Sequence, residues 1–194
     1  MTGQHAQAAA TYWPGNGHSY EVVLAPGAIS WTQADAAAHA AGGYLATLTS
    51  DAENTFVFNL AADPQYWRLD TTHNFGIGPY LGGLQTNKTS EPGGNWAWET
   101  GEAWSYTKWA PDEPNNSYGA EDYLQFFGYG ALMTPQWNDC ANDNSVFVPG
   151  NYAISYIVEF VPEPSTTTLV CLAGGAALVR RLHRRRRFST QIVS

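Results

Sequence analysis

Short hydrophobic runs and two helical patterns divide the first third of the chain. Residues 18–26, HSYEVVLAP, form an apolar run with β-branched positions between Gly- and Pro-containing turns, which predicts a first strand. Residues 30–43, SWTQADAAAHAAGG, are rich in alanine, begin at the capping residue Ser30 and end at two glycines, which predicts a helix. Residues 50–62 predict a second helix, in which Ser50 opens an S-x-x-E capping box.

The rest of the chain up to Phe160 shows no helical period and alternates short apolar runs with turns. These runs predict strands or extended links over residues 44–50, 79–85, 95–104, 121–127 and 152–160. Two early helices and a long, turn-rich β half indicate an α+β fold. We expect its first and last strands to pair and bring the ends of the domain together.

Composition indicates a single aromatic domain with a short appendage. The 194 residues include 8 Trp, 11 Tyr and 8 Phe for the core, with 19 Gly and 11 Pro for turns. Residues 1–179 carry three basic and all 17 acidic residues, a net charge of −14. So acidic a body repels nucleic acid and suits cations or neutral ligands. Two cysteines, Cys140 and Cys171, make no disulfide framework.

The composition changes at Val161. Two prolines, a Ser/Thr patch, an apolar run over residues 169–179 and an arginine cluster follow one another. The run has about 11 apolar residues against the roughly 20 of a relaxed membrane span, so it predicts a short anchor with the arginines on the cytoplasmic side. The alternative is a last core helix with a basic tail that meets nucleic acid. Gly174 and Gly175 weaken such a helix, and no aromatic residues interleave the arginines.

Pro162, Glu163 and Pro164, followed by this apolar run and the arginines, resemble the PEP-CTERM sorting signal of exported bacterial proteins. The resemblance covers residues 161–188. It implies that exosortase recognises the tail, which anchors the protein to the membrane transiently. The implied location is the cell envelope, the outer surface or an extracellular matrix.

Oxygen-bearing side chains gather in three short clusters, EPN, ED and WND. Ca²⁺ takes about six to eight oxygen ligands from carboxylates and amide carbonyls, so the clusters predict a calcium site. The set does not fit zinc, because the five histidines are scattered with no HExxH spacing and Cys140 has no neighbouring ligand in the sequence. The candidate ligands are Glu113, Asn115, Glu121, Asn138 and Asp139.

The proline of EPN allows the bond before it to be cis, which would turn Glu113 and Asn115 toward one ion. The alternative is an ordinary polar turn with Trp137 of WND as core packing, since Asn and Pro are common turn residues. Two such clusters about 22 residues apart, with an acidic pair between them, favour a site. We expect Asp112 and Asn116 to be solvated turn residues.

Residues 12–160 resemble the C-type lectin-like domain. The segments GHSYEVV, YLGGLQ, WAWETGEAWSYTKWAPDEPNN, EDYLQF, WND and YIVEF stand in the family's order and spacing. The resemblance implies a C-type lectin-like fold whose long loop region, through the five candidate ligands, holds the principal Ca²⁺ and a sugar of the mannose, glucose or fucose type. Animal members carry disulfides, whereas Ala38, Tyr123 and Val158 stand where cysteines would be, and Cys140 lacks its partner.

We therefore expect a calcium-dependent glycan-binding protein, exported by a bacterium, with a glycan or exopolysaccharide as its partner. One alternative is a non-enzymatic adhesion or matrix protein that binds protein ligands on the same scaffold. Another is a glycan-cleaving enzyme, but no catalytic motif accompanies the acidic pair it would need. The expected segments are an export-signal end or disordered stretch, the lectin-like domain, the sorting signal and a tail, at residues 1–11, 12–160, 161–188 and 189–194.

Overall fold

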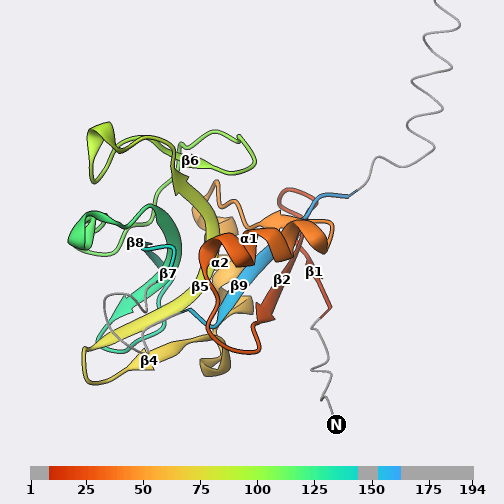
Figure 1. The fold of residues 1–194 in the computed structure, drawn as a ribbon. Helices are drawn as coiled ribbons and strands as arrows, with labels where there is room; N and C mark the ends of the chain where they lie inside the picture. The colour runs from red at the N-terminus through yellow and green to blue at the C-terminus, as the bar shows by residue number, and fades with distance from the viewer. Residues whose placement is uncertain (1–8, 144–152, 163–194) are drawn as a thin grey trace, which may run out of the picture. The chain divides into compact units, whose positions relative to one another are not determined.

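The computed structural model describes residues 9–143 and 153–162 (Figure 1). Residues 1–8, 144–152 and 163–194 lie outside this range, and with them most of the expected export-signal end, most of the sorting signal and the C-terminal tail. Among the described helices, none has the length and apolar character needed to cross a membrane.

The described part of the chain forms two α-helices, three 3-10 turns and nine strands. In chain order these are β1 (Thr11–Tyr12), β2 (Ser19–Leu24), α1 (Trp31–Ala40), β3 (Tyr44–Leu45), α2 (Asp51–Leu60), η1 (Pro64–Tyr66), β4 (Arg68–Asp70), β5 (Phe75–Gln85), η2 (Lys88–Ser90), β6 (Trp96–Trp98), η3 (Ser117–Gly119), β7 (Tyr123–Tyr129), β8 (Gln136–Cys140) and β9 (Ser155–Phe160).

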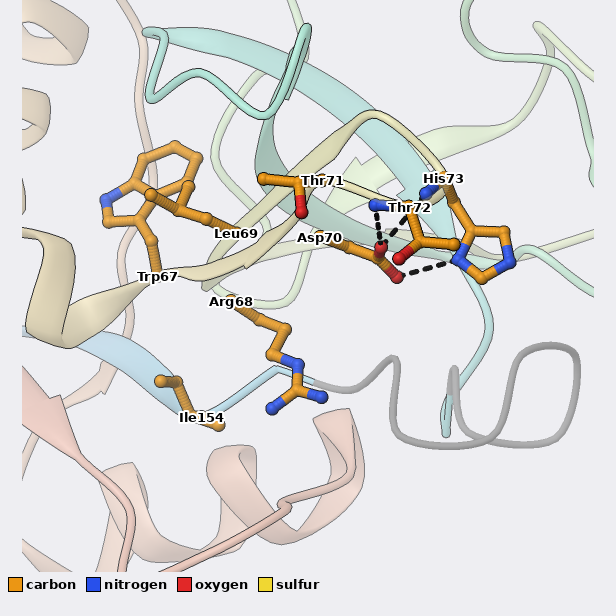
Figure 2. Close-up of a pocket in the computed structure, with 8 residues that line it drawn as sticks. All are labelled: Trp67, Arg68, Leu69, Asp70, Thr71, Thr72, His73 and Ile154. Atoms are coloured by element: carbon orange, nitrogen blue, oxygen red, sulfur yellow. Dashed lines mark hydrogen bonds and ion pairs between the residues drawn. The ribbon is translucent and has the colours of Figure 1, made fainter.

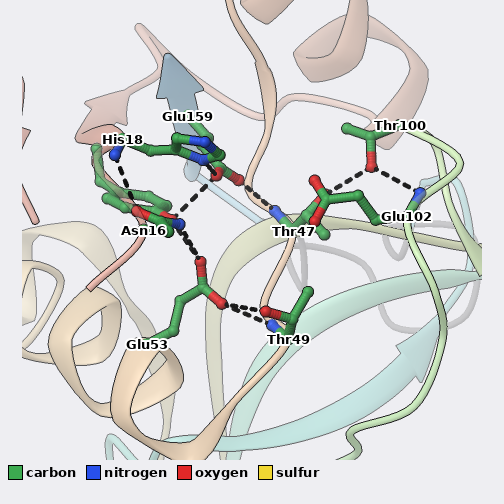
Figure 3. Close-up of polar contacts among 9 residues, drawn as sticks. Asn16, His18, Thr47, Thr49, Glu53, Thr100, Glu102 and Glu159 are labelled. Carbon is green, nitrogen blue, oxygen red and sulfur yellow. Dashed lines mark hydrogen bonds and ion pairs between the residues drawn. The ribbon is translucent and has the colours of Figure 1, made fainter. Parts of the chain in front are cut away.

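Both predicted helices are present, and a serine caps each of them. Ser30 and Gln33 form a reciprocal capping box at the start of α1. At α2, the Ser50 side chain accepts a hydrogen bond from the Glu53 amide. The prediction that the Glu53 side chain completes the capping box at Ser50 is wrong. The Glu53 carboxylate instead accepts from Thr49 N at 2.7 Å (Figure 3). It also accepts from the Tyr20 hydroxyl at 2.5 Å. The residue before the cap and a tertiary partner thus engage this carboxylate.

The strands form one sheet with the order β1-β2-β9-β5-β7-β8, to which β3, β4 and β6 add short pairings. β2 and β9 pair antiparallel, with Ser19 opposite Phe160, so the predicted pairing of the first and last strands is confirmed. Figure 1 shows β5 running between β9 on one side and β7 on the other. A single parallel pairing, Tyr80 with Tyr156, joins β5 to β9.

Two buried clusters lie on the two faces of the central strands. On β9, Ile157 packs into the cluster that contains Val57 of α2, whereas its neighbour Val158 packs with Trp31 of α1. Successive side chains of a strand point to opposite faces, so strands buried on both faces show continuous apolar runs instead of alternation. This burial explains the largely hydrophobic sequence of residues 153–160.

The positions at which the resemblance implies cysteines are filled by other packing residues. Ala38 and Val158 are buried in the same cluster, and Tyr123 stands opposite Cys140 in the β7–β8 pairing. Cys140 is a buried thiol. The Tyr123 ring packs on Trp31, with ring centroids 4.6 Å apart. Aromatic contacts therefore occupy the place of a cross-link.

Candidate functional site

Backbone hydrogen bonds fasten the loop that carries EPN to the strand that carries WND. The amide of Trp137 donates to Lys108 O at 2.8 Å, and the amide of Ala110 donates to Trp137 O at 2.8 Å. This short parallel bridge sets the following EPN segment beside β8. Trp137 is fully buried, so β8 is a fixed platform for the loop.

Tryptophan rings pack around this bridge. Trp98 lies 4.6 Å from Trp104 and 5.7 Å from Trp137, measured between ring centroids. Trp109 packs edge-on against Trp137 at 6.0 Å. The Trp137 Nε1–H donates to the Oδ1 atom of buried Asn54 at 2.7 Å. The tryptophan of WND thus serves the core, while Asp139, two residues after it, faces the loop.

Asp139 organises the loop through its two carboxylate oxygens. Its side chain has no exposed surface. Its Oδ1 accepts from the Asn115 amide at 3.0 Å, and its Oδ2 accepts from the Asn116 amide at 2.7 Å. The Glu113–Pro114 peptide bond before these amides is cis, as predicted. Two of the predicted ligands, Asn115 and Asp139, are therefore in direct contact.

A second set of contacts ties the loop to Glu121. Its Oε2 accepts from the Ser117 amide at 2.7 Å, and its own amide donates to Asn116 Oδ1 at 3.1 Å. The Ser117 hydroxyl donates to Asn115 Oδ1 at 2.7 Å. Asn116 adopts a left-handed conformation, φ 47°, which asparagine tolerates better than most residues. Asn116 is therefore a structural centre of the loop, and the prediction that it is a solvated turn residue is wrong.

Burial and mutual repulsion perturb the acidic groups of this loop. Burial, with Asp139 close by, raises the pKa of Glu113 to about 8, and the Tyr129 hydroxyl, which donates to Glu113 Oε1 at 3.0 Å, lowers it in part. Burial and Asp139 raise the pKa of Glu121 to about 8. Burial also raises the pKa of Asp139, against the lowering effect of the Asn116 and Asn115 amides. Acids so perturbed favour protons or a cation.

One oxygen in the cluster is left without a donor. Glu113 Oε2 is buried and has no hydrogen bond of ordinary geometry within the described residues. Such an atom, beside other carboxylates, suits an oxygen-seeking cation. The oxygens already engaged can also serve, because each carboxylate oxygen carries two lone pairs. The residues present therefore fit Ca²⁺.

The predicted ligands are not all equally close. Glu113, Glu121 and Asp139 do not each place one oxygen within 4.8 Å of an oxygen of both others. Among the described residues, the trio of side chains that meets this criterion is Asp35, His39 and Glu99. Bonds of about 2.3–2.6 Å allow opposite ligands of one calcium ion to lie roughly 5 Å apart, so a separation above 4.8 Å is compatible with that ion. Asn138 is buried on β8 and stands opposite Gln125.

No sequence pattern pointed to Tyr129 or Ser117 as part of this region. Ser117 follows the asparagines of the loop and carries only a turn signal. Tyr129 reaches Glu113 from the end of β7, 16 residues away. Only the strand pairing brings it there.

An open cavity of about 560 Å³ lies elsewhere, beside β4 (Figure 2). Arg68, Asp70 and His73 line it, and Asp70 Oδ2 lies 2.8 Å from His73 Nδ1. None of the predicted site residues lies at this cavity. It is therefore separate from the EPN loop.

Comparisons with known proteins agree on the fold. No family model matches the chain. A lectin from Pleurodeles waltl is 28% identical over 130 residues, an aligned part that spans 66% of this chain and 66% of that protein, slightly under two thirds of either. The cow C-type carbohydrate-recognition domain of CD23, crystallised in the presence of a GlcNAc2Man3 oligosaccharide, is 20% identical with a TM-score of 0.54, over 80% of this chain and 95% of that one.

A calcium-independent type II antifreeze protein is similar to the same degree. It is 19% identical with a TM-score of 0.53, over 81% of this chain and 97% of that one. The three similar proteins are thus described as lectins and an antifreeze protein, and none as an enzyme. The chain has the C-type lectin-like fold, an α+β architecture of two helices and a mixed sheet, as its sequence predicts.

Proposed function

We propose that this protein binds glycans in a calcium-dependent manner at the EPN loop. The observation that carries the proposal is the cluster of Glu113, Glu121 and Asp139, whose carboxyl pKa values are all raised by burial. Without a cation, these groups hold protons or repel one another at neutral pH. A hard divalent cation relieves that repulsion, and the carboxylate and amide oxygens match the ligands of Ca²⁺.

When bound, the ion would supply coordination positions for two neighbouring sugar hydroxyls. The chain's own residues orient the rest of the contact. Asn115 is exposed and its Oδ1 accepts from Ser117 Oγ, which leaves the Nδ2 group as a donor to a hydroxyl. Glu113, held through Oε1 by Tyr129, is the matching acceptor. Sugars of the mannose, glucose or fucose type are the class that we expect from the EPN resemblance.

The test is calorimetric titration of calcium, followed by a glycan array with and without chelator. In Asp139→Ala and Asn115→Ala, we expect calcium affinity to fall by about a hundredfold or more, because each loses a ligand and not merely an outer contact. Asp112→Asn is the matched control, since Asp112 is exposed in the same loop and its φ of 66° suits asparagine. Unchanged calcium binding in both ligand variants would remove the site assignment.

A protein-binding or otherwise calcium-independent role is the second candidate. Its support is the similarity to a calcium-independent antifreeze protein, together with a loop whose Asn115 and Asn116 amides already have partners on Asp139. Binding that persists in chelator would favour this role. Release of free sugar from the array would instead indicate glycan cleavage.

We extend the proposal to export and sorting by exosortase, on the strength of the motif at residues 162–164 and the apolar and arginine-rich text after it. In a host that carries exosortase, we expect the tail to be removed and the body to reach the cell envelope. Replacing Pro162, Glu163 and Pro164 together by alanine should leave the tail attached. Intact-mass analysis of the envelope fraction distinguishes the two forms, and equal processing of both would contradict the sorting proposal.

A further inference from the structure

Three side chains from α1 and the segment after β6 meet at one point. Asp35 and His39 lie one turn apart on α1, and Glu99 follows β6 directly. His39 Nε2 lies 3.3 Å from Asp35 Oδ1 and 3.1 Å from Glu99 Oε2. One ligand atom from each residue lies within 4.8 Å of the other two. No predicted calcium ligand belongs to this trio.

The spacing matches the edges of a small coordination polyhedron. Bonds of about 2.0–2.2 Å from zinc to imidazole nitrogen and carboxylate oxygen place neighbouring ligand atoms of a tetrahedron roughly 3.3 Å apart. Both measured edges at His39 lie close to that value. A helix also presents residues i and i+4 on one face, which sets Asp35 and His39 side by side without any induced change.

The surroundings hold Glu99 and leave one side open. Glu99 Oε1 accepts from the backbone amide of Leu45 at 2.6 Å, an outer contact that fixes the carboxylate and leaves Oε2 for the trio. The Glu99 side chain is 10% exposed and that of His39 is 58% exposed. An ion can therefore enter beside His39 and keep a water at its outer position.

Asp35 is the second carboxylate of the trio. Its side chain is 28% exposed, but its Oδ1 atom is covered and, apart from the ion pair with His39, has no hydrogen bond of ordinary geometry within the described residues. The ligand atoms of Asp35 and Glu99 lie within 4.8 Å of each other, and a positive charge between two such carboxylates relieves their repulsion.

We propose that Asp35, His39 and Glu99 form a site for a divalent transition metal ion, with zinc as the best match. The imidazole nitrogen distinguishes this site from the all-oxygen EPN loop, because Ca²⁺ prefers oxygen and zinc accepts nitrogen and oxygen together. Three protein ligands leave a fourth position for water. The spacing of histidines along the chain carries no sign of this site, since Glu99 lies 60 residues from His39.

The test is calorimetric titration of the untagged, chelator-treated protein with Zn²⁺, and with Co²⁺ read by its visible absorption. Wild type should bind one equivalent at this site, and Co²⁺ should give the intense bands of a tetrahedral ion. His39→Ala, at an exposed position, should weaken binding by about a hundredfold, and Asp35→Asn should do the same. Circular dichroism of both variants would establish that each is folded.

His73→Ala is the matched control. His73 also contacts an aspartate, Asp70, but this pair belongs to no trio within the described residues. His73→Ala should bind Zn²⁺ with the affinity of wild type. Asp139→Ala, which is expected to lose calcium, should also keep its zinc affinity, so the zinc and calcium proposals can fail independently. Absence of zinc binding in wild type would overturn the proposal, as would equal affinity of wild type and folded His39→Ala. In either case the trio is a surface ion-pair cluster.

Discussion

Glu159 shows how one buried acid can depend on several segments. Its side chain is 1% exposed on β9, and its Oε1 lies 2.5 Å from His18 Nδ1 and accepts from the Tyr20 hydroxyl at 3.0 Å (Figure 3). Its Oε2 accepts from the Thr47 amide at 2.9 Å. Burial raises the pKa of Glu159 in spite of these three contacts, each of which lowers it, and nearby Glu53 raises it further. Between the unfolded and native pKa values of Glu159, the native state therefore binds more protons than the unfolded chain does.

This difference predicts a dependence of stability on pH. Because the native pKa of Glu159 is raised above its ordinary 4.5, its contribution to stability is complete below that pH and is lost as the pH rises through the native pKa. In the presence of chelator, we expect the urea-derived free energy of unfolding to fall as the pH rises above 4.5 toward and through the native pKa. Glu159→Gln imitates the protonated acid, so it should fall less steeply.

The control for this experiment is Glu102→Gln, because Glu102 is exposed. This variant should keep the wild-type dependence of the free energy of unfolding on pH. Other acids with raised pKa values, such as Glu99, contribute part of that dependence. An equal dependence of stability on pH in Glu159→Gln and wild type would show that Glu159 has the same pKa in the native and unfolded states. The calcium and zinc proposals do not depend on this result.

At the scale of elements, β8 connects core packing with the loop. Trp137 packs among tryptophan rings and donates to Asn54, and the next residues on β8 are the predicted ligands Asn138 and Asp139. We expect Trp137→Phe to destabilise the protein by about 2–4 kcal/mol, because it leaves a cavity and an unpaired Asn54 oxygen. Urea unfolding measures this effect.

Trp109→Phe is the comparison for that variant, since Trp109 is half-buried in the same cluster. Trp109→Phe should lower the free energy of unfolding by less than Trp137→Phe does. The proposed calcium affinity should also fall in Trp137→Phe, because the loop is fastened to β8 at this residue. Equal stability of the two variants would mean that the Asn54 contact carries little of the effect.

Local patterns predicted the elements that have local causes. Ser30 and Ser50 begin the two helices because capping acts within one turn. β4 escaped prediction because three largely exposed residues carry no alternation. The Glu53 carboxylate and Asn116 were misjudged for another reason: their partners, Tyr20 and Asp139, lie far away in sequence and become neighbours only through the fold.

At the scale of the whole molecule, both proposed sites join remote segments. Glu113 and Asp139 are 26 positions apart in the printed sequence, and the order of the motifs, through a family resemblance, pointed to their meeting. His39 and Glu99 have no such motif, so their meeting was visible only in the structure. Sequence patterns therefore predict a site when the segments that form it carry recognisable motifs.

The missing family disulfides provide a test of how the whole domain is held together. Ala38 on α1 and Val158 on β9 share a buried cluster, and both stand at positions where the resemblance implies cysteines. A bond between them would close a loop of about 120 residues, for which the chain-entropy model gives roughly 4–5 kcal/mol, less about 1 kcal/mol for the lost valine packing. We expect the oxidised Ala38→Cys, Val158→Cys variant to gain about 3–4 kcal/mol in its free energy of unfolding.

Thiol titration and urea unfolding measure this outcome, with the reduced form of the same variant as its control. The native chain has two cysteines, so oxidation of the double variant should lower its titratable thiols from four to two. Packing stabilises the native state, whereas a disulfide restricts the unfolded chain. A higher free energy of unfolding in the oxidised form alone would therefore mean that aromatic packing fills the place of the disulfide but does not reproduce this restriction. Thiols that resist oxidation would instead show that α1 and β9 hold these two positions too far apart or misaligned for a bond.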